Sequence, residues 1–221
     1  REGETLLALP GLLGKITTFS TEEEADWFLR GDDIFCGGSH FIDVSKTRLR
    51  GLHNAENLMA ACAVVEGLTP EVAQAALADY APPVHRCELV GILDQVEWLN
   101  DSKATNLHAL EAALRSQNRP TILIAGGKEK GLDYQLLAPL LAEKVTQAIF
   151  FGEIGASLAG TFFDIVPCET VDTLKEAVKF AAQKTKPGDT VLFSPGTSSF
   201  DQFTGYEARG DAFKSAVLSL P

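Results

Sequence analysis

The stretch Trp98-Leu-Asn-Asp-Ser-Lys-Ala-Thr-Asn106 breaks an apolar, strand-like run into side chains that nearly all form hydrogen bonds, and a helical pattern follows it. Junctions of this kind in α/β domains expose backbone N–H groups at the start of a helix, where anions bind. Asp101, Lys103 and Thr105 offer a carboxylate, an ammonium and a hydroxyl at alternate positions, which suits a ligand with hydroxyl groups and negative charge. The alternative is that Asp101 or Ser102 only caps the helix that follows.

The same order of strand, loop and helix repeats along the rest of the chain and predicts a doubly wound, Rossmann-like α/β sheet. Short apolar runs typical of buried parallel strands lie at Val96–Leu99, Thr121–Ala125, Ala148–Phe151, Phe163–Val166 and Thr190–Phe193. Helical patterns lie between and after them, at Thr105–Ser116, Tyr134–Glu143, Ile154–Thr161, Val171–Lys184 and Gly205–Leu218. Ligands bind where the strands of such a sheet end, and polar blocks at Asp101, Lys128 and Ser194 each follow a strand. We therefore expect these blocks to meet at one edge of the sheet.

The segment before residue 83 has a different pattern and is expected to form a separate, incomplete domain. Short β segments are predicted at Thr5–Leu9, Ile16–Phe19, Ile34–Cys36 and Phe41–Val44. Helices are predicted at His53–Glu66 and at Pro70–Tyr80, with Pro70 in the first turn of the second helix. The paired prolines of Ala81-Pro-Pro-Val84 cannot continue a helix and give a stiff connection. The predicted domains are therefore residues 1–82 and 83–221.

The composition excludes several classes of protein. With 221 residues, 45% of them hydrophobic, the chain can bury a substantial core. Its net charge of −11 argues against a nucleic-acid or anionic-membrane partner, because both need a basic face. The four cysteines form no C-x-x-C pair and the four histidines show no ligand spacing, so neither a disulfide framework nor a zinc site is expected. No apolar run reaches membrane-spanning length, and the expected location is the cytoplasm.

Six blocks of the sequence resemble those of one family, the Mur ligases. They are Gly51–Asn57, His85–Cys87, Asn100–Asn106, Gly126–Lys130, Leu192–Phe203 and Glu207–Gly210. The third block resembles the branch of the family that adds D-glutamate to UDP-N-acetylmuramoyl-L-alanine in peptidoglycan synthesis. The resemblance implies an ATP-dependent ligase that works through an acyl phosphate and serves cell wall biogenesis, cell shape and cell division.

The resemblance also implies parts that lie upstream of these blocks: a phosphate loop, a magnesium-binding carboxylate and a UDP-binding domain. Gly11–Thr17 superficially resembles a phosphate loop, but Ile16 stands where a hydroxyl is needed for Mg²⁺. The only methionine is Met59, so the chain as given does not begin at a translation start. We expect the chain to be the C-terminal half of a longer, monomeric ligase. Residues 1–82 would end its ATP-binding central domain, and the chain alone would be inactive.

By the same resemblance, two groups of residues bind ligands and none binds a metal. Contacts to the ATP nucleotide are implied for Asn54, Asn57, His85, Arg86, Asp101 and Lys103, and Lys103 and Arg86 are also implied in catalysis. Contacts to D-glutamate are implied for Thr105, Lys130, Ser199, Phe200 and Tyr206. A doubly anionic substrate requires cationic and hydroxyl donors in a water-poor pocket, which the second group supplies.

Simpler roles and other functions compete with this interpretation. Asn54 and Asn57 can cap a helix, Arg86 can be a linker charge, and Gly126-Gly-Lys128 can be a plain turn. Other possible functions are a non-catalytic binding module, a sister Mur or folylpolyglutamate ligase, and a nucleotide-binding dehydrogenase. The dehydrogenase lacks support because no G-x-G-x-x-G loop follows the first strand of the α/β region.

Overall fold

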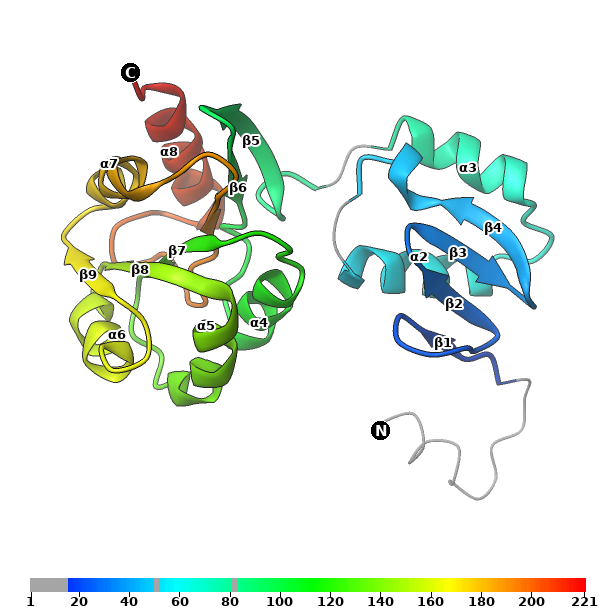
Figure 1. Cartoon of the computed structure of the whole chain (residues 1–221), viewed down its shortest axis with the longest axis horizontal. Coiled ribbons are helices and arrows are strands. Elements are labelled where there is room, and N and C mark those ends of the chain that lie inside the picture. The colour runs from blue at the N-terminus through cyan, green and yellow to red at the C-terminus, as the bar shows by residue number, and fades with distance from the viewer. Residues whose placement is uncertain (1–15, 50–51, 81–82) are drawn as a thin grey trace. The chain divides into compact units, whose positions relative to one another are not determined.

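The computed structural model of the chain describes residues 16–49, 52–80 and 83–221 and divides into two compact units (Figure 1). The N-terminal unit is Arg1–Tyr80 and the C-terminal unit is Ala81–Pro221. The strand predicted at Thr5–Leu9 lies outside the described residues, as does most of the stretch Gly11–Thr17. No helix in the described ranges is both long and apolar enough to cross a lipid bilayer.

In the N-terminal unit, helices pack on a small sheet. The sheet has the order β1-β2-β3-β4, formed by β1 (Phe19–Ser20), β2 (Trp27–Arg30), β3 (Asp33–Cys36) and β4 (Ser39–Asp43). The first two strands pair in parallel, and the later pairs are antiparallel. After the short helix η1 (Val44–Lys46) come α2 (Leu52–Val64) and α3 (Pro70–Ala78). Met59 of α2 and Ala73 of α3 share one buried core with Trp27, Ile34 and Ile42 of the strands.

Most of the elements predicted for this unit are present, but one strand is new and one is misplaced. The helices α2 and α3 and the strands β3 and β4 confirm the predictions to within a few residues. Strand β2 escapes prediction because Trp27 and Phe28 are neighbours that are both buried, so the alternation that marks a half-exposed strand is missing. The prediction of a strand over Ile16–Phe19 is wrong except at Phe19, since residues 16–18 form no strand.

The C-terminal unit contains a six-stranded sheet with the order β5-β6-β10-β7-β8-β9. Five strands are parallel: β6 (Val96–Asn100), β7 (Thr121–Gly126), β8 (Val145–Phe151), β9 (Cys168–Val171) and β10 (Thr190–Phe193). The edge strand β5 (Glu88–Leu93) runs antiparallel to β6. Strands β6, β7, β8 and β10 confirm the predicted positions.

Helices cover both faces of this sheet (Figure 1), as the doubly wound prediction requires. After the short helix η2 (Tyr134–Leu137), α5 (Ala138–Lys144) packs with α4 (Leu107–Arg115) and α6 (Gly155–Phe162) against Leu123 and Phe150. On the other face, α7 (Leu174–Lys184) and α8 (Tyr206–Leu218) pack against Ile124 and Phe151. Ile124 and Leu123 are neighbours in β7, so successive residues of one buried strand point into the two separate cores.

The strand predicted at Phe163–Val166 is wrong, and the strand lies further on at β9. The backbone amides of Ile165 and Val166 both donate to the carbonyl of Phe162, so this apolar run is the end of α6 and its closing turn. Phe163 is 66% exposed, which a buried parallel strand would not allow. An apolar run of this length fits a helix end as well as a strand, and periodicity alone cannot separate the two. Strand β5 has no counterpart among the predictions.

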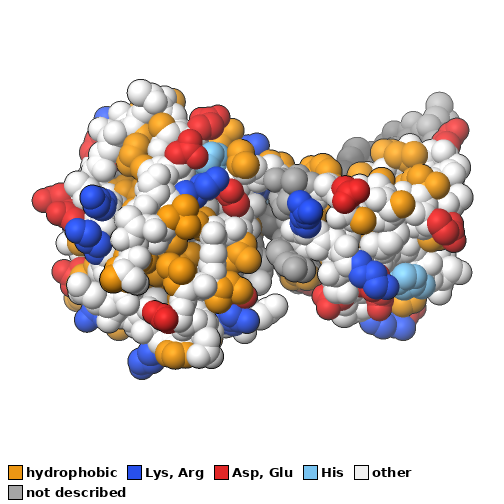
Figure 2. Space-filling view, turned by 90° about the horizontal axis from the view of Figure 1, so that it is seen from above, with side chains coloured by type: hydrophobic (Ala, Val, Ile, Leu, Met, Phe, Trp, Pro, Cys, Tyr) orange, Lys and Arg blue, Asp and Glu red, His pale blue; other side chains and the backbone are white. Residues whose placement is uncertain are grey.

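The order of the strands brings three polar loops to one edge. Phe193, the last residue of β10, lies beside Asn100 at the end of β6 and beside Ile124 near the end of β7. The loops that begin at Asp101, Gly127 and Ser194 therefore leave the sheet side by side. Figure 2 views the C-terminal unit from another side. On that face, acidic and basic side chains surround a central group of hydrophobic ones.

Candidate functional site

The loops that follow β6, β7 and β10 are joined directly by hydrogen bonds. The Ser194 hydroxyl donates to Asp101 Oδ2 at 2.8 Å, and the Gly196 amide donates to the Ala104 carbonyl at 2.9 Å. The Lys128 amide donates to the Ser198 carbonyl at 2.9 Å. The expected convergence of the blocks at Asp101, Lys128 and Ser194 is thus confirmed. It gives one surface at the carboxyl ends of three neighbouring strands, which is where α/β sheets bind ligands.

The side chain of Arg209 in α8 donates hydrogen bonds to two of these loops. No ligand-binding role was predicted for this residue. Its side chain is fully buried, and Nε and Nη2 donate to the hydroxyl and carbonyl of Ser102 at 3.0 and 2.8 Å. Nη1 donates to the Thr197 carbonyl at 3.0 Å. Burial lowers the pKa of this guanidinium to about 10, so it stays charged at neutral pH. The planar fork of arginine makes these three contacts possible at once.

Asp101 does not cap the helix that follows it. Asn106 is the cap of α4, and its side chain accepts from the Ala109 amide at 2.9 Å. The alternative in which Asp101 or Ser102 serves only as the helix cap is therefore wrong. Asp101 is 4% exposed, and its Oδ1 accepts from the Cys87 amide at 3.2 Å while Oδ2 accepts from Ser194. Each carboxylate oxygen keeps a further lone pair for a ligand.

Burial raises the pKa of Asp101 from its ordinary 3.8 to about 6, although the bonds from Ser194 and Cys87 oppose the rise. Between those two values the folded state binds more protons than the unfolded state, so this group adds stability as the pH falls. Relative to an Asp101→Asn variant, the parent should gain about 2 kcal/mol in unfolding free energy between pH 7.5 and pH 4.5. Urea unfolding of both proteins across this range measures the gain. Parallel pH profiles would contradict it.

The lysine side chains of the site differ in whether they form an ion pair with a carboxylate. Lys128 forms an ion pair with Glu153 at 2.6 Å. Within the described ranges, neither Lys103 nor Lys130 forms such a pair. Lys103 Nζ lies 5.9 Å from the centre of the Tyr206 ring, and Lys130 Nζ donates to the Thr105 carbonyl at 3.3 Å. The structure thus groups Lys103 with Tyr206 and Lys130 with Thr105, leaving both ammonium groups available to an anion.

Ser199 and Phe200 are neighbours with opposite exposure. Ser199 is 2% exposed, and its carbonyl accepts from the amides of Gln202 and Phe203 in a tight turn. Phe200 is 69% exposed, an unusual position for a large apolar ring. The turn is held to the loop that follows β8, because Asp201 Oδ2 accepts from the Glu153 amide at 3.2 Å.

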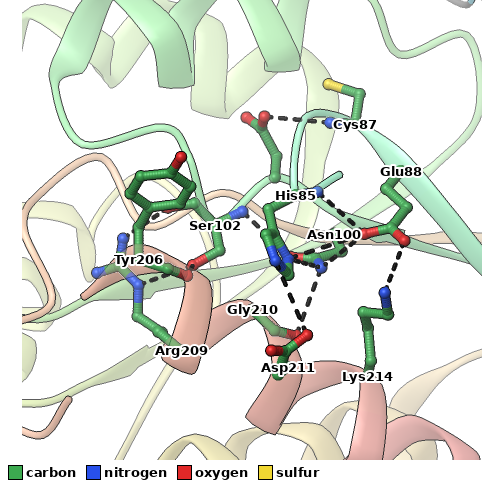
Figure 3. Close-up of polar contacts among 11 residues, drawn as sticks. His85, Cys87, Glu88, Asn100, Ser102, Tyr206, Arg209, Gly210, Asp211 and Lys214 are labelled. Carbon is green, nitrogen blue, oxygen red and sulfur yellow. Dashed lines mark hydrogen bonds and ion pairs between the residues drawn. The ribbon is translucent and has the colours of Figure 1, made fainter. Parts of the chain in front are cut away.

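The turn that carries Arg86 lies against the start of α8 (Figure 3). Arg86 is exposed, whereas His85 is 4% exposed and its ring meets the Tyr206 ring edge-on at 6.2 Å. Buried Asn100 donates to Glu88 Oε2 and lies 3.0 Å from His85 Nδ1. Neither Asn100 nor Glu88 was singled out from the sequence as a functional residue, because nothing local marks a partner 12 or 15 positions away.

The other two predicted nucleotide residues, Asn54 and Asn57, lie on α2 of the N-terminal unit. Asn54 is partly buried and Asn57 is exposed, and a spacing of three places them on one side of the helix. For metal binding, the described ranges hold no group of three or more His, Cys, Asp or Glu side chains close enough to bind an ion.

Comparison with known proteins identifies the family. The family model for the Mur ligase, glutamate ligase domain, matches residues 85–196. The UDP-N-acetylmuramoylalanine–D-glutamate ligase of Chlorobium chlorochromatii is 45% identical over 180 residues, which cover 80% of this chain and 39% of that protein. The enzyme of the same name from Hahella chejuensis is 43% identical and is covered over 43% of its length. The chain thus spans about two fifths of the curated relatives it matches.

Solved structures agree on the fold. The UDP-N-acetylmuramate-alanine ligase of Thermotoga maritima superposes with a TM-score of 0.65 at 13% identity, over 92% of this chain and 48% of that one. The folylpolyglutamate synthase of Mycobacterium tuberculosis, complexed with ADP, gives a TM-score of 0.61 at 15% identity, over 83% of this chain and 44% of that one. The match of the family model over residues 85–196 shows that the chain belongs to the Mur ligase family, and the solved structures agree with its fold.

Proposed function

We propose that the chain is part of an ATP-dependent ligase that joins D-glutamate to UDP-N-acetylmuramoyl-L-alanine. The observation that carries this proposal is the 45% and 43% identity to ligases named for that reaction, over at least 80% of this chain. The use of ATP is supported by fold relatives whose structures are complexes with ADP or AMPPCP. We place the reaction in the cytoplasm and the ligase in a monomeric state, with no nucleic-acid or membrane partner.

In this reaction, ATP converts the carboxylate of the acceptor into an acyl phosphate, and the amine of D-glutamate then displaces phosphate. In both steps negative charge builds up on particular oxygen atoms: those of the transferred phosphoryl group in the first step, and the carbonyl oxygen of the tetrahedral intermediate in the second. Positioned cations next to these oxygens lower the barrier. We assign this role to Arg86 and Lys103, the first for phosphate oxygens because a guanidinium binds them with two parallel bonds. In the C-terminal unit, we also assign His85 and Asp101 to nucleotide binding. In the N-terminal unit, which we assign to an ATP-binding domain, we assign Asn54 and Asn57 to nucleotide binding.

D-glutamate carries two carboxylates, and the proposed pocket offers donors for both. Lys130 supplies an ammonium group with no acidic partner within the described ranges, and Ser199 supplies a hydroxyl in a nearly buried turn. The Thr105 carbonyl accepts a hydrogen bond from Lys130 Nζ, so the two residues are neighbours. Phe200 and Tyr206 would then cover the ligand, since an exposed ring beside a polar pocket excludes water when a substrate binds.

Replacing Lys130 or Ser199 with alanine in the full-length ligase should chiefly damage the use of D-glutamate. Each change removes a donor to a carboxylate, and the loss of about 1.5–3 kcal/mol corresponds to a rise of roughly 10- to 150-fold in the KM for D-glutamate. Phosphate release measured at varied D-glutamate and varied ATP separates the two substrates. Lys179→Ala, on the exposed side of α7, is the control and should change neither.

Two results would count against the proposal in different ways. A rise in the ATP requirement alone would show that Lys130 and Ser199 belong to the other substrate. Phosphate release that depends on a different amino acid, with D-glutamate inert, would show that the chain serves a sister ligase.

A further inference from the structure

The turn that presents Arg86 has a strained backbone. His85 and Cys87, the residues on either side of Arg86, have φ angles of 63° and 45°. A residue with a side chain pays about 1–2 kcal/mol for this left-handed conformation, and such residues persist only where the surroundings hold them in place. Two of them around one exposed arginine require an explanation in the contacts of the turn.

Acidic side chains hold the amides of both strained residues. The His85 amide donates to Glu88 Oε2 at 3.0 Å, and the Cys87 amide donates to Asp101 Oδ1 at 3.2 Å. The His85 carbonyl accepts from the Lys103 amide at 3.0 Å. The turn is therefore joined by its backbone to Asp101 and Lys103, the other two residues that we assign to the nucleotide.

Glu88 is in turn fixed from two further elements. Its Oε2 accepts from the side-chain amide of Asn100 at 3.1 Å, and its Oε1 accepts from Lys214 Nζ at 2.8 Å (Figure 3). Asn100 is fully buried at the end of β6, and its Oδ1 accepts from the Ser102 amide at 3.2 Å. Lys214 comes from α8. Strands β5 and β6 and helix α8 thus meet at one carboxylate.

The approach of α8 to this cluster depends on a glycine. A Cβ atom at position 210 would lie 2.2 Å from Nδ1 of the buried His85 ring. The Gly210 carbonyl also accepts from Asn100 Nδ2 at 3.4 Å. Because glycine inside a helix costs about 1 kcal/mol relative to alanine, the space that it leaves for His85 accounts for its presence.

We propose that Glu88, Asn100 and Lys214 are positioning residues of this ligase: they lock the His85–Cys87 turn and thereby set where Arg86 stands. The inference rests on the proposed function, in which Arg86 binds the nucleotide. It adds three residues that do not contact the nucleotide themselves and act on it through the turn that presents Arg86. None of the three is part of the D-glutamate pocket.

The test is a double-mutant cycle in the full-length ligase. Glu88→Ala should raise the KM for ATP about tenfold and leave the KM for D-glutamate within about twofold. In an Arg86→Ala background, the same change should raise the ATP KM less than about twofold further, because its effect passes through Arg86. Glu97→Gln breaks the 3.1 Å ion pair with Arg119 at the other end of β6 and should leave both KM values unchanged.

A milder variant keeps the test decisive if Glu88→Ala does not fold. Lys214→Met removes the 2.8 Å ion pair that holds Glu88 and does not touch the His85 ring. It should raise the ATP KM and leave the KM for D-glutamate within about twofold. Lys179→Met, on the exposed side of α7, is the matched control and should change neither value.

The possible failures are distinct. If Glu88→Ala and Arg86→Ala raise the ATP KM by factors that multiply, Glu88 acts independently of Arg86 and the positioning role is overturned. If Arg86→Ala itself leaves the ATP KM unchanged, the assignment of Arg86 in the proposed function is wrong, and the inference falls with it.

Discussion

Replacing Arg209 with methionine should lower the free energy of unfolding of the C-terminal unit by about 3 kcal/mol. The change leaves the Ser102 and Thr197 carbonyls, both within buried loops, without their donor from Arg209. A buried acceptor left without a partner costs about 1–3 kcal/mol, and two such acceptors outweigh the gain from removing a buried charge. Urea unfolding monitored by near-UV circular dichroism measures the loss.

Two further variants separate the contribution of the guanidinium's hydrogen bonds from that of its positive charge. Arg209→Lys keeps the charge but cannot reach both loops at once, so it should recover only a part of the lost stability. Arg115→Met, which removes an exposed ion pair with Glu111 on α4, should stay within about 0.5 kcal/mol of the parent. Equal losses for Arg209→Met and Arg115→Met would mean that the buried guanidinium contributes nothing specific.

Gly126→Ala should be more damaging, with a loss of about 4 kcal/mol in the free energy of unfolding. Gly126 ends β7 with a φ of 126°, and a Cβ there would lie 2.1 Å from the backbone carbonyl oxygen of Phe151. That oxygen belongs to the strand paired with β7, so it cannot rotate away as a side chain could. The added methyl must push β7 and β8 apart beside the site.

Gly131→Ala is the matched control for this change. Gly131 also has a positive φ, 65°, but a Cβ there meets nothing within 4 Å, so only the backbone strain of about 1 kcal/mol should appear. The difference between the two variants therefore reports the clash with Phe151 together with the less accessible φ of 126° at Gly126. Similar losses in both would mean that β7 and β8 yield at little cost.

Sequence patterns gave correct predictions for elements whose structure depends on their own local sequence. The apolar runs before Asn100 and Ser194 are strands, and the polar residues after them do lie at one edge. Predictions failed where an apolar run fitted both a strand and a helix end, or where a strand showed no alternation of buried and exposed residues. Phe163–Val166 is apolar enough for a strand but closes a helix, and Trp27–Arg30 buries two neighbours and so shows no alternation. Residues 168–171 form a strand, although half of that strand is exposed.

The sequence by itself determined the α/β class, the positions of most strands and helices, and the polar blocks that follow the strands, because each depends on local periodicity and on residues next to one another. Only the tertiary structure revealed that Arg209 holds Ser102 and Thr197, and that Gly210 makes room for His85. The contacts to Ser102 and His85 depend on β10 lying between β6 and β7, which brings α8 against residues more than 100 positions away. No local pattern encodes that strand order, since it follows from how the whole sheet packs.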